Sequence, residues 1–316
     1  MHRAREMMFG RGGVYEYLEC GSCGTLQLLN PPENPDGAYP QSYYTFDNPI
    51  RDPITASLKR LRARAALTGR GTVGLLMTRA FGVPLVVRWV QDWARYAGVT
   101  PSTSILDVGC GKAHIFPDLI GLGFRSLIGI DPYLEGDIDF GHGIKALRMG
   151  IEDVQTTFDF VMLHHSFEHM GDPDLALRHI HRVLAPEGTA LIRIPIAGSY
   201  AWKTYGTDWV QLDAPRHLLI PSRAGMHILV NRAGFEIAAE VFDSDGFQFW
   251  GSEQYRRGMV LMDPRSHFVH PRRSEFSREQ LREYDLRAGE LNARGEGDSA
   301  GFYLKKKPDP PVAVVP

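Results

Sequence analysis

The sequence predicts an α/β fold with a doubly wound, mostly parallel sheet of seven strands. Three observations support it. Between residues 99 and 245, short apolar runs alternate with helical segments, which is the pattern of parallel strands joined by crossover helices. The first run, ILDV, leads directly into a turn with two glycines, Gly109 and Gly111. A last apolar run at 300–307 supplies the seventh strand, at the edge of the sheet.

Distinct zones follow one another along the 316 residues. Residues 1–45 are rich in Gly, Pro, Tyr and Cys and form an N-terminal appendage, and residues 46–98 have the pattern of a helical segment. The main domain covers 99–308, with an insertion at 246–298 before its last strand, and 309–316 form a tail. The other six strands are expected at 104–108, 126–130, 145–148, 158–163, 189–195 and 235–242.

Composition is typical of a soluble globular protein. Hydrophobic residues make up 43% and charged residues 23%, and the net charge of −2 gives no global field that marks a nucleic-acid binder. The three cysteines are too few for a disulfide framework, and the N-terminus lacks the apolar core of a signal peptide. The most apolar window, 73–90, is interrupted by Arg79, Pro84 and Arg88. These features predict a cytoplasmic protein without a membrane-spanning helix.

The glycine turn predicts a ligand site at the carboxyl end of the first strand of the sheet. A dinucleotide fingerprint needs a third glycine where this chain has His114, and a phosphate-binding P-loop is also absent. Asp131 ends the second strand, 24 residues after Asp107, and an acid in that place accepts hydrogen bonds from ribose hydroxyls. The turn therefore favours a single nucleoside with a small charged tail over a dinucleotide.

Residues 99–245 resemble the class I methyltransferases that use S-adenosylmethionine, whose fold is Rossmann-like. ILDVGCGKAHI (105–115) looks like their first motif and IGIDPY (128–133) like their second. The block 158–195 is similar to their fourth strand, helix and fifth strand, with an L-x-P-x-G turn at 184–188. Ala113 departs from the pattern, because members of this family usually have a third small residue, glycine, at that position.

The resemblance implies roles for individual residues. Asp107 and the glycines are expected to line the methionine and ribose portions of the cofactor, Asp131 to hold the ribose diol, and Glu152 to lie near the adenine. The cofactor-binding set is Asp107, Gly109, Cys110, Gly111, Asp131, Pro132, Glu152 and His165.

Two stretches supply candidates for removing a proton from the methyl acceptor. HHSFEH (164–169) ends the fourth strand of the main domain, and DWVQLDAPRHLLIP (208–221) follows the fifth, where this fold builds its acceptor pocket. Histidine is the natural base near neutral pH, so His217 and His169 are the catalytic candidates. Trp209 and Arg216 are assigned to substrate binding.

Cys20 and Cys23 form a Cys-x-x-Cys pair, which is half of a tetrahedral zinc site. The N-terminus resembles the zinc-ribbon leader of a methyltransferase subgroup often associated with sugar and surface-polysaccharide modification. In that subgroup an earlier Cys pair precedes a stretch like MMFGRGGVYEY, and this sequence does not contain one. The pair is either a structural zinc clip or two reduced cysteines in a turn.

Aromatic side chains in two other stretches resemble acceptor-side elements of the same subgroup. Tyr43 and Tyr44 lie in SYYTF, and Trp250 lies in FQFWGSEQY. Aromatic rings stack on sugar faces, and they are also ordinary core residues. We assign these three residues to substrate binding.

The segment 51–95 carries nine Lys or Arg residues against two acids, Asp52 and Asp92. Its basic amphipathic pattern is explained either by a solvated helix face or by attraction to phosphate groups or an anionic membrane surface. A protein that is cytoplasmic and peripheral to the membrane fits the second interpretation. Nucleic acid is not expected as a partner.

The expected activity is S-adenosylmethionine-dependent methyl transfer, EC class 2.1.1, to an acceptor that carries a sugar, either a nucleotide sugar or a surface glycan. One alternative is O-methylation of a lipid, a quinone or an aromatic natural product. Another is a non-catalytic partner protein that keeps the fold, against which the intact glycine turn argues. A nicotinamide oxidoreductase is disfavoured by His114.

Overall fold

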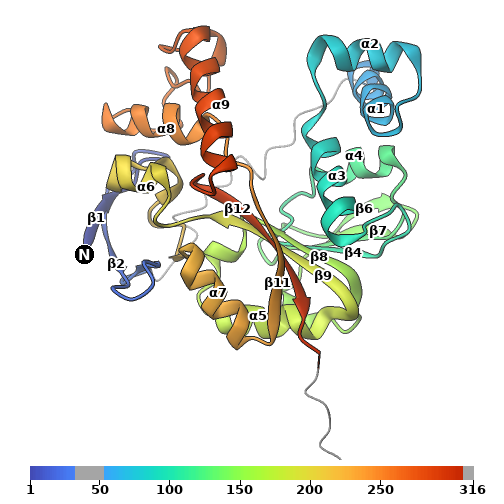
Figure 1. Ribbon diagram of the computed structural model, residues 1–316, viewed down its shortest axis with the longest axis horizontal. Helices are drawn as coiled ribbons and strands as arrows, with labels where there is room; N and C mark the ends of the chain where they lie inside the picture. The colour runs from blue at the N-terminus through green and yellow to red at the C-terminus, as the bar shows by residue number, and fades with distance from the viewer. Residues whose placement is uncertain (33–52, 309–316) are drawn as a thin grey trace, which may run out of the picture. The chain divides into compact units, whose positions relative to one another are not determined.

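The computed structural model describes residues 1–32 and 53–308 (Figure 1). The chain divides into two compact units, each described by itself. Unit 1 comprises Met1–Pro40, His165–Leu177 and Ile192–Phe302. Unit 2 comprises Gln41–His164, Arg178–Leu191 and Tyr303–Pro316. Tyr43, Tyr44 and the expected tail 309–316 lie outside the described residues.

Within the described residues, the large sheet has eight strands in the order β11-β12-β9-β8-β4-β5-β7-β6. Strand β4 lies between β5 and β8 and is parallel to both, and β5 is parallel to β7. The strands are β4 (Ile105–Val108), β5 (Leu127–Ile130), β6 (Ile138–Gly141), β7 (Ile144–Leu147), β8 (Phe158–His164), β9 (Leu184–Pro195), β11 (Phe235–Phe242) and β12 (Ser299–Lys306).

Two details of this sheet differ from the sequence prediction. The eighth strand is β6, which pairs antiparallel with β7 through a hairpin whose residues Gly141, His142 and Gly143 all have positive φ. Its sequence, IDFG, is half exposed and therefore lacks the apolar signal of a buried strand. The stretch 184–188, expected to be a turn, forms the beginning of β9.

Helices α1 (Pro53–Thr68), α2 (Thr72–Phe81), α3 (Leu85–Ala97) and α4 (Phe116–Leu122) belong to unit 2. Helices α1 and α2 pack closely, because a Cβ added at Gly74 would lie 2.5 Å from the Cβ of Ala65. Helix α3 buries Val87, Val90 and Trp93 along one face. Among the described residues, no single helix is long and apolar enough to span a membrane, and α2 with α3 reaches that length only across a bend of 102°.

Unit 1 contains a second, four-stranded antiparallel sheet in the order β1-β2-β3-β10. Its first three strands, β1 (His2–Arg5), β2 (Val14–Glu19) and β3 (Leu26–Leu28), come from the N-terminal segment, and β10 (Leu219–Ile220) comes from the region after β9. The N-terminal segment is therefore not a separate appendage within unit 1. Its Tyr17 and Leu26 belong to the same buried core as Trp209 and Phe249.

The remaining elements follow the strands of the large sheet. Helices α8 and α9 lie in sequence between β11 and β12, and α9 begins with a capping box formed by Ser277 and Gln280. The elements are α5 (Pro173–Val183), α6 (Tyr200–Tyr205), α7 (Arg223–Arg232), α8 (Phe247–Arg256), α9 (Arg278–Ala293) and the short helices η3 (Ile151–Asp153), η4 (Phe167–His169), η5 (Gly206–Asp208), η6 (Val210–Leu212) and η7 (Pro271–Arg273).

Candidate functional site

The turn after β4 has the backbone that its glycines predict. Gly109 and Gly111 have φ values of 76° and 50°, in the left-handed region that side chains with a Cβ disfavour. The amides of Gly109 and Cys110 both donate to the carbonyl of Ile130, which ties the turn to the end of β5. Ala113 also has a positive φ, 51°, at the position where the sequence departs from the glycine pattern.

Asp131 is fixed directly after β5. Its Oδ2 accepts the Gly111 amide at 2.9 Å, and its Oδ1 accepts the Tyr133 amide at 2.9 Å. The carboxylate therefore belongs to the glycine turn. Because a carboxylate oxygen has two lone pairs, each oxygen retains acceptor capacity for a ligand hydroxyl.

Asp107 lies on β4, opposite Gly129 of β5, and is buried. Burial, and secondly the charge of Asp131, raise the pKa of Asp107 to about 7. A carboxylate next to the turn repels a phosphate and attracts a cationic ligand. The electrostatics of this part of unit 2 thus agree with the exclusion of a dinucleotide that the sequence indicated.

The other predicted cofactor residues offer fewer polar groups that could contact a ligand. The Cys110 thiol donates to the Gly111 carbonyl and packs against Gly129, where an added Cβ would lie 2.6 Å from the sulfur. Pro132 and Glu152 are exposed. Both ring nitrogens of His165 contact protein groups, Nδ1 the Glu168 carboxylate and Nε2 the Arg193 guanidinium, so the ring orients Glu168.

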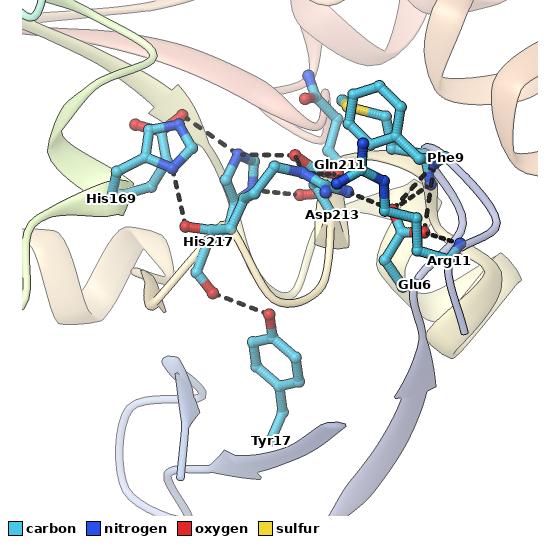
Figure 2. A network of polar contacts seen from close by, with 11 residues as sticks. Glu6, Phe9, Arg11, Tyr17, His169, Gln211, Asp213 and His217 are labelled. Carbon is cyan, nitrogen blue, oxygen red and sulfur yellow. Dashed lines mark hydrogen bonds and ion pairs between the residues drawn. The ribbon is translucent and has the colours of Figure 1, made fainter. Parts of the chain in front are cut away.

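A polar cluster in unit 1 brings together the two predicted bases, His169 and His217. Their rings lie edge to face with centroids 4.8 Å apart (Figure 2). His169 Nδ1 contacts the Arg216 carbonyl at 2.8 Å, and His217 Nδ1 contacts the Gln211 carbonyl at 2.8 Å. Since a carbonyl only accepts, both Nδ1 atoms carry the proton and both Nε2 atoms have the lone pair.

Glu168 adds a fully buried carboxylate to this cluster. Burial would raise its pKa, but the hydrogen bond from His165 and the nearby histidines lower it to about 2. Burial, and secondly His169, lower the pKa of His217 to about 4. At neutral pH the cluster therefore holds an ionised Glu168 beside a neutral His217. The half-buried His169 is the more accessible of the two candidate bases.

Arg216, assigned to substrate binding from the sequence, forms buried ion pairs within the protein. Its guanidinium is buried and binds both oxygens of Asp213, at 3.0 and 2.9 Å from Nε, and Glu6 Oε1 at 3.0 Å from Nη2. Glu6 also accepts the amides of Met8, Phe9 and Arg11 (Figure 2). Arg216 is thus a structural ion-pair residue that joins two distant segments of unit 1.

Two residues that support the cluster carry no recognisable signal in the sequence. Glu6 has no motif around it, and its partner Arg216 lies 210 positions away in the sequence. The hydroxyl of Tyr17 donates to the His217 carbonyl at 2.8 Å (Figure 2). Only the position of the N-terminal strands identifies these contacts.

Trp209, also assigned to substrate binding from the sequence, lies in a buried core. It is fully buried in the core of unit 1, and its indole N–H donates to Asp298 at 2.9 Å. Trp250 is half buried between Phe247 and His267, whose ring centroids each lie 4.7 Å from it. A substrate role stays a prediction for both Trp209 and Trp250.

Cys20 and Cys23 flank the tight turn between β2 and β3 as free thiols. Cys20 Sγ lies 3.1 Å from the Ser22 hydroxyl, and the Cys23 thiol donates to Thr25 Oγ1 at 3.3 Å. His2, on the neighbouring strand β1, contacts the Glu19 carboxylate at 2.7 Å. Among the described residues, clusters of three or more metal-ligand side chains do not include the cysteine pair.

A family of methyltransferase domains matches residues 55–240, which is more than half of the chain. The chain belongs to this methyltransferase domain family. The match confirms the Rossmann-like α/β fold class that the sequence predicted.

Curated methyltransferases match part of this methyltransferase domain protein. The tRNA U34 carboxymethyltransferase of Alteromonas mediterranea is 25% identical over 176 residues, which are 49% of this chain and 53% of the relative. The ubiquinone biosynthesis O-methyltransferase of Pseudomonas paraeruginosa is 28% identical over 148 residues, 42% of this chain and 61% of the relative. The chain spans about half the length of the curated relatives it matches.

Among solved structures, a mycolic acid cyclopropane synthase complexed with SAH and CTAB is similar to 79% of this methyltransferase domain protein and 94% of its own chain. The identity is 15% and the TM-score 0.45. A likeness of that size bears on neither the site nor the activity.

Proposed function

We propose that the protein is an S-adenosylmethionine-dependent methyltransferase. The observation that carries the proposal is the pair of buried acids, Asp107 and Asp131, at the glycine turn of unit 2. S-adenosylmethionine has a sulfonium, an ammonium group and ribose hydroxyls, and it has no phosphate. Those groups suit two carboxylates, whereas the pyrophosphate of a nicotinamide dinucleotide does not. When bound, the cofactor supplies an electrophilic methyl group.

The chain's own groups have two remaining tasks in such a reaction. Asp131 is positioned to accept hydrogen bonds from the ribose, because its two contacts to backbone amides fix both oxygens. A hydroxyl acceptor must also lose its proton, and Nε2 of His169 or His217 is the atom that accepts one. Replacing the true base by Ala is expected to lower turnover by roughly 10²–10⁴-fold with little effect on cofactor affinity.

For the acceptor we propose a sugar-containing molecule, a nucleotide sugar or a surface glycan, on the strength of the N-terminal resemblance. The alternative is an O-methyl acceptor of the lipid, quinone or aromatic class. The similarity to a ubiquinone biosynthesis O-methyltransferase supports the alternative. Transfer of a labelled methyl group from S-adenosylmethionine to nucleotide sugars and to hydroxyl-bearing quinone precursors, tested side by side, distinguishes the two.

We propose that the protein is cytoplasmic and that the helices of unit 2 contact an anionic membrane surface. Residues 53–91 contain no Asp or Glu. On and beside α2, the side chains of Leu76, Phe81 and Leu85 are 68%, 69% and 58% exposed. Apolar side chains among basic ones are the composition of an interfacial helix, whose apolar face enters the headgroup region. The alternative is that these helices bind the phosphate groups of a soluble acceptor instead of a membrane surface.

The methyl-transfer assay defines the function together with two single variants. His169→Ala and His217→Ala are measured for turnover and for cofactor binding, and His227→Ala, an exposed histidine that contacts Glu240, is the matched control. Loss of turnover with intact binding in one variant identifies the base. Normal turnover in both single variants and the double variant excludes both histidines. No methyl transfer to any acceptor of the panel, with S-adenosylhomocysteine unbound, overturns the proposed function.

A further inference from the structure

Glu168, His169 and His217 bring one carboxylate and two imidazoles to a single point of unit 1. One candidate ligand atom from each residue lies within 4.8 Å of the others. Glu168 and His169 are neighbours on η4, and His217 precedes β10. The Leu218 amide donates to the Glu168 carbonyl at 2.8 Å and thereby holds the two segments together.

Both imidazoles are oriented as metal ligands are. Each Nδ1–H donates to a backbone carbonyl, that of Arg216 for His169 and that of Gln211 for His217. A histidine that binds a metal through one nitrogen characteristically donates its other N–H to a carbonyl or carboxylate, which fixes the tautomer and the ring. The lone pairs are thus on the Nε2 atoms.

The carboxylate of Glu168 also favours a bound cation. Glu168 is completely buried, and its Oε2 has no hydrogen-bond partner among the residues that the structure describes. Its Oε1 accepts the Nδ1–H of His165 at 3.2 Å, which orients the group but leaves the buried Oε2 unsatisfied. Leaving a buried acceptor unsatisfied is unfavourable, and more so when the acceptor is charged. A cation bound by Oε2 would offset that cost.

The spacing is wider than that of hydrogen bonds and suits an ion between the ligands. His217 Nε2 lies 3.9 Å from Glu168 Oε1 and 4.0 Å from Asp213 Oδ2. Bonds of about 2.0–2.2 Å to a tetrahedral zinc ion place neighbouring ligand atoms about 3.4 Å apart. Atoms up to 4.8 Å apart reach that distance by side-chain movements of about 1 Å.

We propose that Glu168, His169 and His217 bind one divalent transition-metal ion, with one coordination position left for an oxygen ligand. Two histidines and one glutamate form a ligand set that zinc takes in sites with an open position. If the methyl transfer proposed above is correct, that oxygen is the acceptor hydroxyl, whose acidity the ion raises. Only this role rests on the proposed function. A histidine with its lone pair on the ion does not act as a base, so the two roles exclude each other.

The test is Co²⁺ binding to the full chain after treatment with a chelator, followed by the visible absorption of the ion and by competition with Zn²⁺. The chain carries Cys20→Ser and Cys23→Ser, so that the thiol pair does not contribute. One equivalent of Co²⁺ is expected to bind, and Glu168→Gln and His169→Ala are each expected to weaken binding at least tenfold. His227→Ala is the matched control and should bind as the parent does.

Two results would overturn the proposal. One is the absence of stoichiometric Co²⁺ and Zn²⁺ binding by the folded parent chain. The other is binding that Glu168→Gln and His169→Ala leave unchanged. S-adenosylhomocysteine binding, measured on the same samples, reports separately on the proposed function, because its predicted residues Asp107 and Asp131 belong to unit 2.

Discussion

Replacing Arg216 with Met should destabilise the protein by about 3–5 kcal/mol, because the change leaves two buried carboxylates without their cation. The Arg216 side chain is 1% exposed, and those of Asp213 and Glu6 are 9% and 5% exposed. Burial alone would raise the pKa of Asp213, but the charge and hydrogen bonds of Arg216 hold it below its usual value. Met keeps the aliphatic stem of the arginine, so that most of the loss reports on the ion pairs.

The assay is equilibrium unfolding in guanidinium chloride, followed by tryptophan fluorescence and compared at a constant m-value. The matched control is Arg223→Met, which removes an ion pair to Glu240 from an arginine side chain that is 61% exposed and should cost less than about 1 kcal/mol. Adding Asp213→Asn and Glu6→Gln to the Arg216 variant should restore part of the lost stability. If Arg216→Met costs no more than the control, the ion pairs are not structural and Arg216 returns as a candidate for binding a ligand.

Three further outcomes are expected. The free energy of unfolding should fall by up to about 4 kcal/mol between about pH 4 and pH 7, because the pKa of Asp107 is about 7 in the folded chain and near 3.8 in the unfolded chain. The folded chain therefore binds the proton more tightly, and Asp107→Asn should remove this part of the pH dependence of unfolding. Flotation with anionic vesicles at low salt should be strong for the parent chain and weak for a Leu76→Ser and Phe81→Ser double variant. The control Leu286→Ser changes an exposed leucine of α9 and should float as the parent does. Equal flotation of all three proteins contradicts a membrane contact through α2. If the cysteine pair of the β2–β3 turn is a zinc clip, metal analysis should find about one zinc per chain that is lost when both cysteines become serine, and a melting temperature indifferent to chelation would argue against it.

The strands of the large sheet were predictable wherever they are buried on both faces. Strands β4, β5 and β8 are short, mostly apolar runs, and the sequence predicts each within a residue of its observed limits. Strand β6 was missed because half-exposed residues in a hairpin carry a weaker pattern. Strand β10 has only two residues, which are too few to form a pattern in the sequence. Its pairing partner, β3, lies almost two hundred residues earlier in the chain.

The candidate site was predictable where local backbone determines it. The left-handed conformations of Gly109 and Gly111 follow from the residue type, and Asp131 follows from its place directly after a strand. Arg216 and Trp209 were assigned to a substrate because polar and aromatic residues after β9 look the same whether they face a ligand or the core. Their partners, Glu6 and Asp298, are distant in sequence, and only the fold brings them together.

The most direct test of the central claim is calorimetric titration of the purified chain with S-adenosylhomocysteine and, separately, with NAD. We expect S-adenosylhomocysteine to bind and NAD not to bind. Asp131→Ala should weaken the binding by roughly 1–3 kcal/mol, because it leaves the ribose hydroxyls without their acceptor. Glu135→Ala, which changes an exposed acid beyond the same strand, should bind as the parent does. Binding of NAD together with no response to S-adenosylhomocysteine would contradict the assignment of the glycine turn to a methyl donor.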